Sequence, residues 1–147
     1  MLLRERAGDG RVVPIYIGAP EATAIALALD GVDTPRPMTH DLVRDMFDEL
    51  GVDMVRVVVS DLRDKTFYAE LHLVSAGETH VVSSRPSDAI ALAVRTGTPI
   101  YADEAVVDEV GYREVEEGEE GEEPRSEEVV EEFKEFLDSI SPEDFED

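Results

Sequence analysis

The chain has 147 residues, 42% of them hydrophobic, which is enough for one domain with a core and an appendage. Its 13 basic and 36 acidic residues give a net charge of −23, which excludes indiscriminate attraction to nucleic acid, because Lys and Arg drive that binding. Without cysteine, disulfides, thiolate catalysis and Cys-ligated metals are excluded. No apolar run is long enough to span a membrane, and the start shows no secretory pattern, so we expect a cytoplasmic protein.

The first part of the chain predicts one strand and two helices. Residues 12–18 are β-rich and contain Pro14, which places this strand at an edge or ends it there. Residues 20–30 predict an alanine-rich helix that is apolar on nearly every side, so we expect it to be buried in the core or at a subunit interface. Thr39 is a suitable cap for a third element, a helix over residues 40–50. That helix has one apolar stripe, made of Leu42, Val43, Met46, Phe47 and Leu50.

The middle of the chain predicts a sheet. Residues 54–60, 66–74 and 79–84 are β-rich, and short polar segments, the first over residues 61–65, join them into an antiparallel meander. Alternation places Glu70 and His72 side by side on the face opposite Leu71 and Leu73.

A helix capped by Ser87 follows the meander, with a short strand over residues 99–101 and a short helix over residues 103–110. We therefore expect an α+β fold, an antiparallel or mixed sheet with helices packed on it.

The acidic excess is concentrated near the end of the chain. Residues 111–147 hold 3 basic and 17 acidic residues, a balance of −14, whereas the balance of residues 1–110 is −9. We expect a domain over residues 1–112, an acidic flexible linker over residues 113–126, and an amphipathic helix with an acidic tail over residues 127–147. The acidic polar face of that helix favours docking on protein and not on an anionic membrane.

Two segments share one order of residue types, Arg36-Pro37-Met38-Thr39-His40-Asp41 and Arg85-Pro86-Ser87-Asp88. We call them the two cassettes. Each places an arginine beside a helix start whose first N–H groups lack intrahelical partners, which suits an anion. The repetition raises the alternative of an internal duplication, although the flanking residues do not clearly repeat. A structural interpretation is also open, in which each arginine pairs with a nearby Asp and each hydroxyl only caps a helix.

The side chains around the cassettes suit phosphodiester hydrolysis. A histidine titrates near neutral pH and can act as a base, carboxylates can orient it or hold a divalent ion, and arginines bind phosphate in a bidentate manner. A His–Asp pair at a helix start is more often a local hydrogen bond, so a structural role stays open here too. The candidates are His40, Asp41, Asp88 and Glu70 for catalysis; Arg36, Arg85, Thr39 and Ser87 for substrate binding; and Glu21, Asp41 and Asp88 as ligands of Mg²⁺ or Mn²⁺.

Four segments, residues 15–22, 36–42, 61–71 and 84–93, resemble the bifunctional nuclease family, also described as a DNase/RNase domain, in the same order and at compatible spacing. The ending over residues 133–145 is similar to that of actinobacterial members. The resemblance implies an α+β nuclease of DNA and RNA that assembles as an oligomer, and we expect a homo-oligomer, with a dimer favoured. The matching motif positions are Glu21, Arg36, Thr39, His40, Asp41, Glu70, Arg85, Ser87 and Asp88.

One departure from the family pattern concerns the N-terminus. Family members usually have a further strand before the segment that matches residues 2–5, so we expect either an upstream start or a sheet without that edge strand.

Two other functions stay open at this point. The overall acidity and the docking-type C-terminal helix favour a non-enzymatic binding or regulatory module that recognises a phosphorylated or acidic ligand. The second alternative is autoinhibition, in which the acidic tail occupies the anion site and inhibits the protein.

Overall fold

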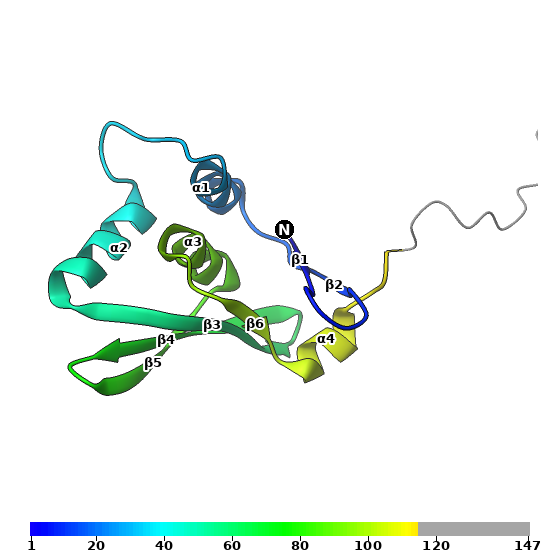
Figure 1. Cartoon of the computed structure of the whole chain (residues 1–147). Coiled ribbons are helices and arrows are strands. Elements are labelled where there is room, and N and C mark those ends of the chain that lie inside the picture. The colour runs from blue at the N-terminus through cyan, green and yellow to red at the C-terminus, as the bar shows by residue number, and fades with distance from the viewer. Residues whose placement is uncertain (115–147) are drawn as a thin grey trace, which may run out of the picture. The chain divides into compact units, whose positions relative to one another are not determined.

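Four helices and two sheets make up residues 1–114, the part of the chain that this computed structural model describes (Figure 1). The linker and amphipathic helix predicted beyond residue 114 lie outside the described residues. None of the described helices is long and apolar enough to cross a membrane. In chain order the elements are β1 (Leu2–Arg4), β2 (Val12–Pro14), α1 (Ala19–Leu29), α2 (Thr39–Leu50), β3 (Val52–Arg63), β4 (Thr66–Ser75), β5 (Glu78–Ser84), α3 (Pro86–Thr96), β6 (Ile100–Ala102) and α4 (Glu104–Val110).

The larger sheet confirms the predicted meander and extends it. Strands β3, β4 and β5 are antiparallel neighbours, and β6 pairs in parallel with β3, so the order is β5-β4-β3-β6. The join between β3 and β4 is shorter than predicted. Asp64 and Lys65, at φ 49° and 63°, are the two left-handed residues that a tight hairpin turn requires, and β3 therefore continues to Arg63.

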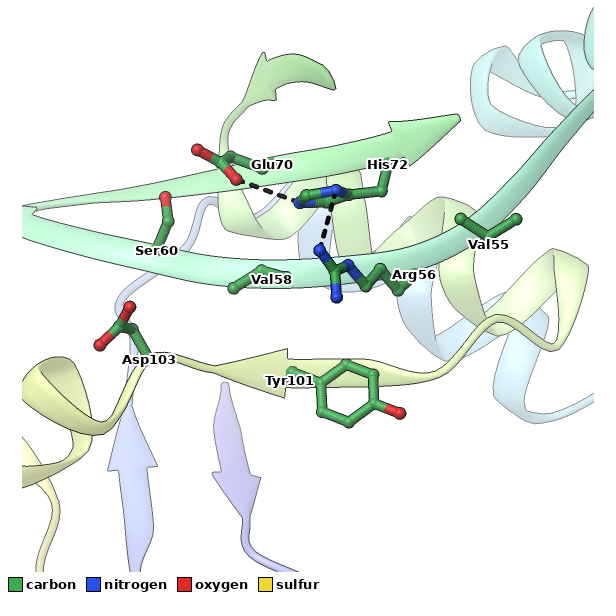
Figure 2. Close-up of a pocket in the computed structure, with 8 residues that line it drawn as sticks. All are labelled: Val55, Arg56, Val58, Ser60, Glu70, His72, Tyr101 and Asp103. Atoms are coloured by element: carbon green, nitrogen blue, oxygen red, sulfur yellow. Dashed lines mark hydrogen bonds and ion pairs between the residues drawn. The ribbon is translucent and has the colours of Figure 1, made fainter. Parts of the chain in front are cut away.

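Helices α1, α2 and α3 all lie on one side of this sheet (Figure 1). We call the opposite face, which these helices do not cover, the open face. Glu70 and His72 of β4 project from this open face, next to Val58 of β3 and near Tyr101 of β6 (Figure 2). The predicted alternation along β4 is thus confirmed.

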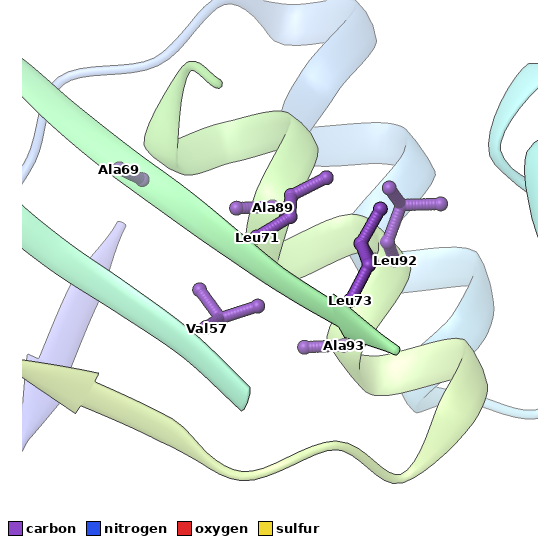
Figure 3. Close-up of a cluster of buried hydrophobic side chains, with 7 residues drawn as sticks. All are labelled: Val57, Ala69, Leu71, Leu73, Ala89, Leu92 and Ala93. Carbon is purple, nitrogen blue, oxygen red and sulfur yellow. The ribbon is translucent and has the colours of Figure 1, made fainter. Parts of the chain in front are cut away.

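The core lies between the sheet and α3. Ala89, Leu92 and Ala93 of α3 pack on apolar side chains of β3 and β4 (Figure 3). The other side of α3 contacts α1, where Ile90 meets Ile25. Because α3 is enclosed between the sheet and α1, its alanines are useful, since small side chains allow close approach on both sides. The strand side chains in this core are Val57, Ala69, Leu71 and Leu73.

Both predicted helix caps are wrong. Helix α2 begins at Thr39 itself, with Met38 as the capping residue, and Asp41 Oδ2 accepts a hydrogen bond from the Met38 N–H at 2.9 Å. Helix α3 begins at Pro86, whose fixed φ suits the first helical position, so Ser87 lies inside the helix and is buried. Neither hydroxyl makes the cap hydrogen bond.

Two helices expose apolar surface that their sequence predicts to be buried. Within residues 1–114 only Ile25 of α1 is buried, and Leu29 is 68% exposed, so burial in the core of the described domain is wrong for this helix. The alternative, a subunit interface, stays a prediction. The stripe of α2 is divided. Val43 and Phe47 pack against the core, whereas Leu42, Met46 and Leu50 are at least half exposed.

Arg95, near the end of α3, joins the three helices. Its side chain is only 4% exposed, and its Nε donates to Asp41 Oδ1 of α2 at 2.8 Å. Its Nη2 donates to the Ala24 carbonyl of α1 at 2.9 Å, and its Nη1 to the Ala91 carbonyl of its own helix at 2.8 Å. The hydrogen bond from Arg95, with that from the Met38 N–H, lowers the pKa of Asp41. Asp41 therefore has a structural role.

We expect Arg95→Ala to lower the free energy of unfolding by about 3 kcal/mol, because it leaves a carboxylate and two carbonyls without their buried partner. The control is Arg113→Ala, which removes an exposed ion pair with Asp9 and should change stability by less than about 0.5 kcal/mol. Urea unfolding measures both. Equal effects of the two substitutions would contradict the role given to Arg95.

Candidate functional site

The two cassettes meet at the N-terminal end of α3. His40 of α2 lies against Asp88 of α3, with 2.9 Å between His40 Nε2 and Asp88 Oδ1. Arg85 holds the same carboxylate through two hydrogen bonds, from Nε to Oδ2 at 2.7 Å and from Nη2 to Oδ1 at 3.0 Å. Its Nη1 donates to Glu21 Oε1 of α1 at 3.2 Å. We call Glu21, His40, Arg85 and Asp88 the four-residue cluster.

Asp88 determines which ring nitrogen of neutral His40 carries the proton. The hydrogen bonds from Arg85, and then that from His40, lower the pKa of Asp88, so this carboxylate is ionised at neutral pH and only accepts hydrogen bonds. Neutral His40 must therefore carry its proton on Nε2, which leaves the lone pair on Nδ1. The His40 side chain is 15% exposed and that of Asp88 is 32% exposed, so the pair lies near the surface but is shielded.

The carboxylate of Glu21 lies against Gly18 as well as Arg85. A Cβ at Gly18 would collide with Glu21 Oε2, so any other residue there would displace this carboxylate. The Arg85 side chain is 63% exposed, and its hydrogen bonds to Asp88 and Glu21 raise its pKa. Three of its five N–H groups bond to these carboxylates, which leaves two for an incoming anion.

Five other predicted site residues lie outside the cluster. Asp41 pairs with Arg95, and Glu70 projects from the open face of the sheet, where its partner is His72. Glu70 and Asp88 are on opposite sides of the sheet, so the structure does not bring them together. Arg36 is exposed in the loop before α2 and makes no ion pair within residues 1–114, and Thr39 and Ser87 cap no helix.

The predicted divalent metal site does not fit the residues as they are arranged. Arg85 bonds to both Glu21 and Asp88, so a guanidinium already holds the carboxylates that a cation would need. The third predicted ligand, Asp41, forms an ion pair with Arg95. Within residues 1–114, no group of three or more His, Asp or Glu side chains is placed to hold a metal ion.

A concave site lies on the open face of the sheet, away from the four-residue cluster. We call it the open-face hollow. Its volume is about 620 Å³, and strand residues and Asp103 line it (Figure 2). Alternation along β4 predicts Glu70 and His72 on this face, but no sequence pattern indicates the other polar members, because only the register of β3 with β4 and β6 brings them together. The lining residues are Val55, Arg56, Val58, Ser60, Glu70, His72, Tyr101 and Asp103.

Comparison with known proteins adds independent information. The family described as bifunctional nuclease domain has a sequence profile that matches residues 1–114. An uncharacterized protein of Mycobacterium tuberculosis is 49% identical over 146 residues, which cover 99% of this chain and 87% of that protein. Bifunctional nuclease 2 of Arabidopsis thaliana is 30% identical over 121 residues, and bifunctional nuclease 1 of the same plant is 29% identical. The matches cover 80% of this chain but only 37% of either plant protein.

The lowered pKa of Asp88 makes a prediction about stability in acid. Because its folded-state pKa lies below the usual value of 3.8, Asp88 stabilises the fold at neutral pH, and this contribution disappears as the pH falls through the folded-state pKa. We expect Asp88→Asn to be less stable than the wild type at pH 7, with the difference shrinking below about pH 4. Urea unfolding across this range measures it. A difference of constant size from pH 7 to pH 3 would contradict this role for Asp88.

Proposed function

Because the chain belongs to the bifunctional nuclease domain family, we propose that it hydrolyses phosphodiester bonds of DNA and RNA, with the four-residue cluster as the active site. The observation that carries this proposal is the meeting of His40 with Arg85 and Asp88. His40 comes 45 positions before Arg85 and 48 before Asp88, yet the three form one partly exposed group of a base, a cation and an orienting carboxylate.

In the proposed reaction Arg85 binds the scissile phosphate through its two remaining N–H groups. His40 Nδ1 takes a proton from a water molecule as the water oxygen attacks phosphorus. The bond from phosphorus to the leaving oxygen breaks, and the imidazolium returns the proton to that oxygen. Arg85 stabilises the charge on the non-bridging oxygens, and Asp88 stabilises the imidazolium while it exists.

No step of this mechanism passes through a resident metal, because the cluster does not fit one. We propose that Mg²⁺ or Mn²⁺ arrives with the phosphates of the nucleic acid. There it would offset part of the repulsion between the substrate and a chain of net charge −23.

We also propose that the protein works as a homo-oligomer, most simply a dimer. The exposed apolar side chains of α2, with Leu29 of α1, support this, since exposed apolar surface commonly marks an interface.

A second candidate function rests on the same cluster. Every carboxylate in it is paired with Arg85 or His40, so the cluster can also have a purely structural role, in which its ion pairs connect α1, α2 and α3. A binding module could use the exposed Arg85 to recognise a phosphorylated ligand without cleaving it.

The cleavage test compares four variants with the wild type. We expect His40→Ala and Arg85→Ala each to reduce cleavage of single-stranded DNA and of RNA by about 100-fold or more, since they remove the base and the phosphate-binding cation. His80→Ala on exposed β5 and Arg113→Ala, whose side chain is 66% exposed, are the matched controls and should retain activity. All proteins are purified identically and assayed with Mg²⁺ and with EDTA.

The outcomes separate the two candidates. Loss of cleavage in both cluster variants, assayed at a temperature at which each variant is folded, supports the nuclease. Equal activity in all five proteins would mean a contaminating nuclease and would remove the support for cleavage at the cluster. A wild type that binds RNA but cleaves neither substrate would favour the binding module.

A further inference from the structure

The open-face hollow lies on the side of the sheet away from the four-residue cluster, so the proposed hydrolysis does not use it. Its volume of about 620 Å³ falls within the range of small-molecule sites. Its polar side chains are unevenly distributed. Arg56 lies near one end, beside Val55, whereas Ser60 and Asp103 lie at the other end, and the strand positions of Val58 and its register partner Tyr101 lie between them (Figure 2).

Arg56 differs from most arginines of the domain because no carboxylate within residues 1–114 pairs with it. Its one side-chain contact is a long hydrogen bond of 3.4 Å from Nη2 to His72 Nδ1. Four of its five N–H groups therefore have no protein partner in the described part of the chain. An arginine in this state at a concave site favours a ligand with several acceptor oxygens, and phosphate matches its planar geometry best.

His72 holds this guanidinium in position. The His72 side chain is 12% exposed, and its Nε2 lies 3.1 Å from Glu70 Oε2. Because an arginine N–H only donates, Nδ1 is the acceptor, and Nε2 carries the proton that it donates to Glu70. Both ring nitrogens are engaged, so His72 acts as a support. A group that is oriented before a ligand arrives loses less entropy on binding.

The rest of the hollow suits a planar base. Tyr101, 55% exposed, is in register with Val58 on the neighbouring strand, so together they offer an aromatic ring and an apolar surface. Ser60 and Asp103 at the far end provide acceptors for an amino group. Arg56 and Ser60 are four residues apart on β3, about 13 Å along an extended strand, which is comparable to the span from the phosphate of a nucleotide to the far edge of its base.

We propose that the open-face hollow binds a nucleotide, with its phosphate on Arg56, its base against Tyr101 and the amino group of the base on Asp103. The chemistry is the same for a free mononucleotide and for one unit of a single strand. Adenine and cytosine bind more tightly than uracil, because the exocyclic group that faces Asp103 is an amino donor in those bases and a carbonyl acceptor in uracil, and a carboxylate only accepts hydrogen bonds. Binding of a nucleotide in the hollow requires no cleavage, so this proposal can be tested independently of the proposed hydrolysis.

The test is a titration of the isotope-labelled full chain, followed by NMR, with AMP, CMP, UMP and a short cytosine oligonucleotide. We expect saturable shifts of the Arg56, His72 and Tyr101 signals, and weaker binding of UMP than of CMP. Arg56→Ala should weaken CMP binding about tenfold or more, which is the loss of a charge-assisted hydrogen bond. Arg63→Ala, on the same strand but outside the hollow, is the control and should bind as the wild type does.

The backbone spectrum of each variant shows whether it is folded. If the oligonucleotide binds more tightly than CMP, the hollow holds part of a strand, and if the two bind equally it holds a free nucleotide. Both results support the site. It is overturned if no probe gives saturable shifts, if the shifts map to the four-residue cluster instead, or if folded Arg56→Ala binds CMP as the wild type does.

Discussion

The arrangement of the three helices depends on one buried guanidinium. Arg95 is almost completely buried. Its three nitrogens donate hydrogen bonds to three different helices: to a carboxylate of α2, a carbonyl of α1 and a carbonyl of α3. A buried charge is tolerated only when it is paired and hydrogen-bonded, so α1 and α2 must both lie where they meet these donors. Side-chain packing alone would not do this, because α1 buries a single residue and half of the apolar stripe of α2 remains exposed.

This constraint brings the two cassettes together. Once Arg95 fixes Asp41 at the start of α2, the preceding residue, His40, lies against the first turn of α3, where Asp88 and Arg85 are. The ionic contacts of the cluster then add a second connection between the same three helices. Structure and proposed catalysis therefore share residues. Asp88 stabilises the fold through the same contacts that orient His40, and Arg85 is tied to two carboxylates yet exposed enough to meet a phosphate.

Local patterns predicted much of the fold and part of the site. Alternation along β4 and the turn residues around it were sufficient for the meander, and the arginine-proline cassettes marked two helix starts that do meet. The remainder depended on tertiary contacts. Arg95 resembles any charged residue at the end of a surface helix until its burial is known. Glu70 was grouped with the cassettes because a carboxylate can orient a base or hold a divalent ion, although its own alternation with Leu71 already placed it on the face away from α3. The hollow around Arg56 needed the register of three strands, which no single segment encodes.

The most direct test of the central claim, that the cassettes form one oriented His–Asp–Arg group, is the protonation state of the imidazole of His40. Long-range ¹H–¹⁵N NMR spectra distinguish the two neutral tautomers, and the chain has only two other histidines, so single His→Ala variants assign all the signals. The structure predicts that neutral His40 carries its proton on Nε2 in the wild type and that this preference is lost in Asp88→Asn, with exposed His80 unchanged in both proteins. A proton on Nδ1 of His40, or identical spectra of the wild type and Asp88→Asn, would contradict it.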